Sequence, residues 1–210
     1  MDNPGTGPDE LTGRLIDEAG RLLAAHGPEG LSLRKLAAAT GTSTMSVYTR
    51  FGGKPQLLAA MHREALRRLG AALDEASTGA SGSLEQLAGL GHAYRRAALA
   101  SSTLYAMMFG PPAPGFEPVA EDEAAARATY QPLIDGIRRC VEDGLMAGDA
   151  ERIAVHLWAV LHGMVGLELA GRLPVPADAV EQAYEEALVF AAAPFLVDPA
   201  ARPHRRRRAR

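Results

Sequence analysis

Apolar residues recur at helical spacing along most of the chain, and short polar stretches separate these periodic segments. Over residues 9–26 the apolar positions lie three and four apart, which predicts one face of a helix ending at Gly27. Ser32 can cap a second short helix, and Gly41 can adopt the left-handed conformation of a tight turn after it. A third short helix is expected over about residues 43–48.

The rest of the chain continues this helical pattern. Pro55 suits the first turn of a fourth helix that runs to about Asp74, and STGASGS, residues 77–83, is a polar break. Pro132 predicts a kink or a late start in its own segment, because proline lacks the amide donor that a helix needs. Sustained strand alternation is absent from the sequence, so the predicted fold is all-α. The later helices are expected at about residues 84–100, 102–109, 121–145, 150–169 and 177–196, with a proline-rich loop at 110–118.

These segments predict two functional parts flanked by disordered ends. Residues 9–74 are expected to form a small helical head with a linker helix, and residues 84–198 a larger helical body. Residues 1–8 and the arginine-rich residues 199–210 are expected to be disordered.

The cellular setting follows from the cysteine content and the absence of a secretory signal. The single cysteine, Cys140, cannot form an intramolecular disulfide, and the first residues lack both a basic start and an apolar stretch, which favours the cytoplasm. The longest apolar run, residues 153–171, contains His156, His162 and Glu168. It therefore predicts a buried helix, and no membrane partner is expected.

Charge is concentrated in one internal segment. Residues 31–68 carry seven basic residues and one acidic residue, whereas residues 69–201 carry seven basic and eighteen acidic residues. A basic segment in an acidic protein suits a surface that faces phosphates, although a solvated helix face has the same composition.

The second and third predicted helices have the spacing of a helix-turn-helix. Ala37, Gly41 and Val47 lie where a close helix crossing, a turn and a locking apolar residue are needed. The N-terminal end of the second helix of such a pair enters the DNA major groove. That end carries mainly small hydroxyl side chains, which can approach phosphates and base edges, although Thr42 and Ser43 also suit helix capping. The residues assigned to it are Thr42, Ser43, Thr44, Met45 and Ser46, followed by Tyr48, Arg50 and Lys54.

The stretch LSLRKLAAATGTSTMSVYTRFGGKPQLLAAM resembles the DNA-binding head of the TetR family of bacterial transcriptional repressors. By position, the resemblance implies phosphate contacts for Tyr48, Lys54 and Ser46. It also implies base contacts for Thr44, Met45 and Arg34, and it places Lys35 beside Arg34 in the DNA-facing pattern. Arg50 departs from the family pattern, since many members have histidine there.

The body resembles the C-terminal domain of a TetR subgroup marked by a tryptophan and a following His-Gly, here Trp158 and His162-Gly163. This resemblance implies a homodimer built on the last two long helices, around a small-molecule pocket. Small residues at helical spacing support such an interface, because they let helix backbones approach closely, although packing within one chain would use them too. The expected interface comprises Ala159, Gly163, Gly166, Ala170, Ala179, Ala183, Ala187 and Ala191.

Aromatic, polarisable and hydrogen-bonding residues gather around the irregular part of the body and suit a mostly apolar cavity, although any one residue of this kind is more often part of the core than a ligand contact. The candidate ligand-binding residues are Tyr105, Met108, Phe109, Tyr130, Trp158 and His162.

Catalysis is not expected. His156 and His162 are six residues apart and lie on different helix faces, so they cannot chelate one metal, and the chain lacks the common hydrolase, nucleotide and metal motifs. We therefore expect no cofactor and no metal. The expected function is a repressor that binds a palindromic operator as a dimer and is released by a small molecule. An architectural or ligand-independent DNA-binding protein is the alternative, and a small-molecule carrier with an inactive head is a further one.

Overall fold

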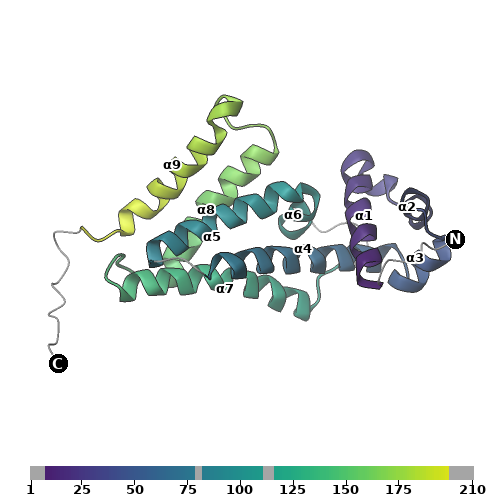
Figure 1. Cartoon of the computed structure of the whole chain (residues 1–210), viewed down its shortest axis with the longest axis horizontal. Coiled ribbons are helices and arrows are strands. Elements are labelled where there is room, and N and C mark those ends of the chain that lie inside the picture. The colour runs from purple at the N-terminus through teal and green to yellow at the C-terminus, as the bar shows by residue number, and fades with distance from the viewer. Residues whose placement is uncertain (1–7, 79–81, 111–115, 199–210) are drawn as a thin grey trace. The chain divides into compact units, whose positions relative to one another are not determined.

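The computed structural model describes residues 8–78, 82–110 and 116–198, and these residues fold into α-helices without a β-sheet. The all-α prediction is confirmed. Figure 1 labels the α-helices. The elements in chain order are α1 (Pro8–Gly30), α2 (Leu33–Thr40), α3 (Thr44–Phe51), α4 (Lys54–Ala76), α5 (Ser83–Ala100), α6 (Ser102–Phe109), α7 (Ala120–Glu142), α8 (Ala150–Leu169), the 3-10 helix η1 (Ala177–Ala179), α9 (Val180–Ala192) and the 3-10 helix η2 (Ala193–Phe195).

The chain divides into two compact units. The N-terminal unit comprises residues 1–70 and 100–129, and the C-terminal unit comprises residues 71–99 and 130–210. This division differs from the limits expected from the sequence, because α6 and the first part of α7 belong with the N-terminal helices. The segments expected to be disordered, residues 1–8 and 199–210, lie outside the described residues, except that Pro8 begins α1.

Local sequence signals set the first three helices. Gly27 has a non-helical backbone (φ 67°, ψ −176°), so the regular part of α1 ends there as expected. Ser32 accepts a hydrogen bond from the Lys35 amide at 3.2 Å and caps α2. Gly41 is left-handed (φ 68°, ψ 24°), and the Thr42 amide donates to the Ala37 carbonyl at 3.0 Å. This Schellman turn reverses the chain between α2 and α3.

The N-terminal unit is held by one continuous hydrophobic core. Residues from α1 to α4 pack together, and Leu104 of α6 and Phe116 join the same cluster. An ion pair with a buried carboxylate adds to it, since Arg63 of α4 donates from Nε to Asp122 of α7 at 2.7 Å. The side chain of Asp122 is only 2% exposed, and it also accepts the Val119 amide at 3.1 Å, which caps the start of α7.

The C-terminal unit packs α5, the later part of α7, α8 and α9 around its own core. Tyr184 of α9 is buried and donates its hydroxyl hydrogen to the Gly91 carbonyl of α5 at 2.8 Å. Gly91 permits this close approach, because an added Cβ would lie 2.4 Å from a Leu188 side-chain carbon. Arg95 and Glu168 form a two-bonded ion pair at 2.8 and 2.7 Å between α5 and α8.

Two expectations from the sequence need correction. The α7 helix begins at Ala120 and continues past Pro132, so the late start does not occur. The α8 helix is not buried on all sides: Leu157 and Val165 lie in the core, but Val155 and Leu167 are exposed. By length and composition α8 could cross a membrane, and it is the helix of the described chain that meets this test. One side of α8 is therefore buried and the other exposed, as in an amphipathic helix, although both sides carry apolar residues.

Candidate functional site

The outward face of α3 is the first candidate site. Val47 and Phe51 point into the core of the N-terminal unit, and the opposite side of the helix exposes Met45 and Tyr48, with 73% and 56% of their surfaces accessible. Thr44 and Thr49 are exposed as well. The sequence interpretation missed Thr49, although its position four residues after Met45 places it on the same face.

The hydroxyl residues before and within α3 have different local roles. Ser43 caps the helix, since its Oγ accepts the Ser46 amide at 3.0 Å, and its hydroxyl hydrogen stays available to an acceptor. The Thr42 Oγ1 is buried and has no hydrogen-bond partner among the described residues. As placed, the Thr42 hydroxyl is not presented to DNA, which differs from its assignment as a contact.

The basic segment separates into free and paired cations. Arg34 and Lys35 lie side by side at the exposed start of α2, and neither side chain forms an ion pair or a hydrogen bond with another described residue. The three arginines of α4 are bound by carboxylates, so they contribute less to an outward positive surface. These pairs are Arg63 with Asp122, Arg67 with Glu64, and Arg68 with Glu64 and Asp17.

Two other predicted contacts are turned toward α1. Arg50 donates from Nη1 to the Thr12 hydroxyl at 2.6 Å and is partly buried, because it lies one turn from the inward-facing Val47. The structure therefore gives Arg50 a packing role in place of the predicted DNA contact. Lys54 donates from Nζ to the Pro28 carbonyl at 2.5 Å. Its ammonium has two further hydrogens, so a phosphate contact is compatible with this bond.

An aromatic cluster in the C-terminal unit is the second candidate site. Three of the predicted ligand residues meet there: Tyr130 lies edge-on to Trp158 with ring centres 5.8 Å apart, and the rings of Trp158 and His162 are 5.5 Å apart. The Tyr94 hydroxyl lies 3.0 Å from His162 Nδ1. The sequence interpretation missed Tyr94, because the contact joins residues on two different helices that no local spacing relates.

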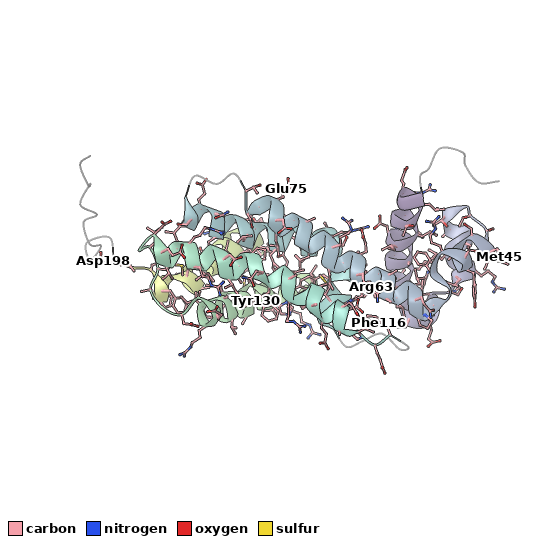
Figure 2. All side chains as sticks on the ribbon, turned by 90° about the horizontal axis from the view of Figure 1, so that it is seen from below. Met45, Arg63, Glu75, Phe116, Tyr130 and Asp198 are labelled. Atoms are coloured by element: carbon pink, nitrogen blue, oxygen red, sulfur yellow. The ribbon has the colours of Figure 1, made fainter. Side chains whose placement is uncertain are left out.

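Burial sets the protonation states in this cluster. It lowers the pKa of His162, so the imidazole is neutral at neutral pH, and it raises the pKa of the Tyr130 hydroxyl. The Tyr130 Oη is buried without a hydrogen-bond partner among the described residues. An unsatisfied buried hydroxyl costs about 1–3 kcal/mol, so this atom favours any bound group that can pair with it. Figure 2 marks its position on α7.

The other three predicted ligand residues lie on α6, in the N-terminal unit. Tyr105 and Phe109 contact each other with ring centres 4.9 Å apart, and Met108 packs against the core of that unit. The structure thus divides the predicted set into two groups. A surface groove of about 310 Å³ lies elsewhere in the C-terminal unit and is lined by Ala72, Glu75, Ala76, Ala93, Arg96 and Ala97, none of which was predicted.

The predicted dimer residues differ between α8 and α9. Ala159, Gly163 and Gly166 of α8 and Ala170, which caps its C-terminus, are all exposed, and Val155 and Leu167 are exposed beside them. Ala179, at the end of η1, and Ala183 and Ala187 of α9 are half-buried, and Ala191 of α9 is only 4% exposed, because they pack within the chain. Ala191 therefore cannot contact a partner. The exposed apolar residues of α9 are instead Val189 and Phe190, at 62% and 70%.

A capped helix pair with an exposed second helix and free cations beside it defines a helix-turn-helix DNA-binding protein. Comparison with known families agrees. Residues 15–61 match the family described as bacterial regulatory proteins, tetR family, and residues 87–191 match the tetracyclin repressor-like C-terminal domain. The chain belongs to the TetR family, and it is a transcriptional regulator with a DNA-binding helix-turn-helix, not an enzyme.

The individual proteins that the chain resembles have only distantly similar sequences. The chain is 25% identical over 143 residues to an HTH-type transcriptional regulator of Mycobacterium tuberculosis, a match that covers 67% of this chain and 60% of that protein. It is 34% identical over 71 residues to the HTH-type transcriptional repressor AcnR of Corynebacterium glutamicum, covering 34% and 38% of the two chains. The chain thus spans at most three fifths of these relatives. The TetR family regulator PfmR of Thermus thermophilus has the same fold, with a TM-score of 0.65, 23% identity, and coverage of 83% and 97%.

Proposed function

We propose that this chain is a cytoplasmic repressor that binds a palindromic operator as a homodimer and is released from it by a small molecule. The observation that carries the proposal is the outward face of α3, where Met45 and Tyr48 are exposed and Ser43 caps the helix end. The helix N-terminus favours a phosphate, and the exposed side chains are free to meet base edges. A relative named as a repressor supports the direction of regulation.

Exposed apolar surface supports the dimer. Val155 and Leu167 of α8 and Val189 and Phe190 of α9 lie in the same unit, on two helices that pack against each other. On α8, Val155, Ala159, Gly163 and Leu167 follow one another four residues apart and are all exposed, so they form one stripe, and exposed apolar patches mark interaction sites. The small residues of α8 let a partner helix approach closely. A two-fold dimer would present two α3 helices and so require a near-palindromic site.

The aromatic cluster supports ligand release. Tyr130, Trp158 and His162 combine flat apolar surface with a neutral imidazole and an unpaired hydroxyl, which suits an aromatic or heterocyclic molecule carrying a hydrogen-bonding group. Such a molecule releases DNA only if it prefers a dimer whose heads misfit the two half-sites. The coupling is then reciprocal, so operator DNA weakens the ligand by the same factor, typically about 5- to 150-fold.

The proposal is tested with two neighbouring variants. The side chains of Arg34 and Lys35 are exposed and lie outside the core, and the α2 cap uses only the backbone amide of Lys35, so each residue can be replaced by alanine without disturbing the core. A guanidinium pairs bidentately with guanine, whereas an ammonium on a phosphate carries no base information. Arg34→Ala should lose about 1–3 kcal/mol on an operator and relax its preference at one position, whereas Lys35→Ala should weaken all sequences alike and flatten the salt slope.

The measurement is fluorescence anisotropy with a duplex selected by the wild-type chain from a random-sequence pool and with a scrambled duplex of equal length. Equal losses on both duplexes for Arg34→Ala would contradict base reading by this residue. Equal wild-type affinity for the two duplexes would favour the architectural alternative. A thermal-shift screen against metabolites and antibiotics identifies the ligand, because a molecule that binds only the folded state raises the melting temperature.

A further inference from the structure

Met45 is the most exposed large hydrophobic side chain of the described chain, with 73% of its surface accessible. Among the side chains described between residues 10 and 70, the only other exposed large hydrophobic one is Tyr48, and it lies three residues after Met45 on α3. Residues at this spacing are neighbours on a helix surface. The large apolar side chains that residues 10–70 leave in water therefore lie together on the outward side of α3.

Folding does not require the Met45 side chain. The core of the unit is formed by Val47, Phe51 and residues of the neighbouring helices, and Met45 is not among them. The cap of α3 uses the Ser43 hydroxyl and the Ser46 amide, again without Met45. In Figure 2 Met45 lies at the end of the N-terminal unit that is away from Arg63 and Phe116. A long apolar side chain held outside the core at the first turn of a DNA-facing helix is available to pack against an apolar group of the DNA.

The major groove offers one such group. Among the base edges exposed there, the C5-methyl of thymine is the apolar feature, and the others are hydrogen-bond donors or acceptors. The thioether of methionine is flexible and polarisable, so it can follow the methyl group, whereas the neighbouring hydroxyls of Thr44 and Ser46 suit polar edges and phosphates. We propose that Met45 is a specificity-determining residue that packs against the C5-methyl of one thymine in each half-site. This inference rests on the proposed operator binding.

The test removes the proposed contact first from the DNA and then from the protein. The wild-type chain selects duplexes from a random-sequence pool, and each thymine of the selected site is then replaced, in symmetric pairs, by deoxyuridine, which deletes only the methyl group. Burial of one methyl-sized group is worth roughly fourfold in affinity for each half-site. One symmetric pair, which removes a methyl from both half-sites, is expected to weaken binding of the wild-type chain about fifteenfold, and every other pair less than about twofold.

Met45→Ala and Met45→Gln should each weaken binding to the thymine duplex and abolish the difference between the thymine and deoxyuridine duplexes at that pair. Met45→Gln keeps the length of the side chain, so it separates loss of apolar character from loss of size. Met45→Leu is the matched control and should keep the methyl sensitivity. Arg34→Ala is the second control, because it should lower affinity and leave the methyl sensitivity unchanged.

The outcomes separate operator binding from the role of Met45. If the wild-type chain selects no sequence from the pool, the proposed operator binding itself fails. If it selects a site but no deoxyuridine pair weakens binding, or if the loss persists unchanged in Met45→Ala, operator binding stands and the role of Met45 is overturned. Loss of the methyl effect in the alanine and glutamine variants, with retention in the leucine variant, supports the assignment.

Discussion

Removing the hydroxyl oxygen of Tyr184 should lower stability, whereas removing that of Tyr130 should not. Both tyrosines lie in the C-terminal unit, and burial raises the pKa of both hydroxyls, so both are protonated at neutral pH. They differ in hydrogen bonding. The Tyr184 hydroxyl donates to the Gly91 carbonyl at 2.8 Å, whereas the Tyr130 Oη is buried without a partner among the described residues. Tyr184→Phe is therefore a matched control for Tyr130→Phe.

The magnitudes follow from these contacts. A buried hydrogen bond contributes about 0.5–1.5 kcal/mol, and the Gly91 carbonyl, inside α5, keeps its helical hydrogen bond when the tyrosine hydroxyl is lost. Tyr184→Phe should thus cost about 1 kcal/mol. Tyr130→Phe removes an unsatisfied polar atom and should be neutral or stabilising by up to about 1 kcal/mol. For a chain of this size, 1 kcal/mol corresponds to a melting shift of about 2–4 °C.

Differential scanning calorimetry of the unliganded chain and its two variants measures these shifts. A molecule found in the thermal-shift screen is then titrated into each variant, and Tyr130→Phe should bind it about fivefold more weakly if the hydroxyl pairs with the ligand. If Tyr130→Phe lowered the melting temperature as much as Tyr184→Phe, the hydroxyl would be satisfied within the protein and the expected contrast would be wrong. Unchanged ligand affinity would remove Tyr130 from the binding site.

Three single positions give further predictions. Gly163→Leu should leave the protomer folded, because a Cβ there meets nothing within 4 Å, and should dissociate the dimer in sedimentation experiments. Gly41→Ala should lower the free energy of unfolding by about 1–2 kcal/mol in denaturant titrations, because Gly41 has a left-handed backbone. The space around Gly41 is open, so this cost comes from the backbone and not from a clash. Asp122→Asn should flatten the acid limb of stability: the Arg63 hydrogen bond lowers the folded pKa of Asp122, so the stabilisation it provides is lost as pH falls below about 4.

Each of these has its own check. A leucine variant that remains a native-like dimer would remove Gly163 from the interface. Gly13→Ala, in the helical part of α1 with open space around its Cβ, should stabilise by about 0.5–1 kcal/mol, and a loss like that of Gly41→Ala would contradict the backbone argument. Wild-type and Asp122→Asn chains that lose stability in parallel as the solution is acidified from neutral pH would exclude the ion pair as the cause.

Features set by neighbouring residues could be predicted from the sequence. The caps at Ser32 and Ser43 and the turn at Gly41 need only residues within four positions, and the structure has all three. The boundaries of α6 follow from flanking breakers in the same way. The face of exposed small residues along α8 could also be predicted, because their spacing places them on one side of a helix.

Features that depend on contacts between residues far apart in the sequence could not be predicted from it. Whether Arg50 faces DNA or α1 is decided by Thr12, which is 38 residues away. The basic character of α4 is reduced by Asp122, 59 residues from Arg63. The α9 alanines suggested an interface, but whether a stripe of small residues faces a partner or its own chain depends on which neighbour covers it, and Ala191 is covered within the protomer.

Sedimentation velocity with a fluorescent duplex measures stoichiometry and sequence preference together. The duplex carries the sequence selected by the wild-type chain, and a scrambled duplex of the same length and composition serves as the competitor. For a dimeric, sequence-specific regulator we expect two chains on each selected duplex, with binding to the scrambled duplex weaker by about a thousandfold or more at physiological salt. One chain per duplex, or equal affinity for the two sequences, would contradict this function.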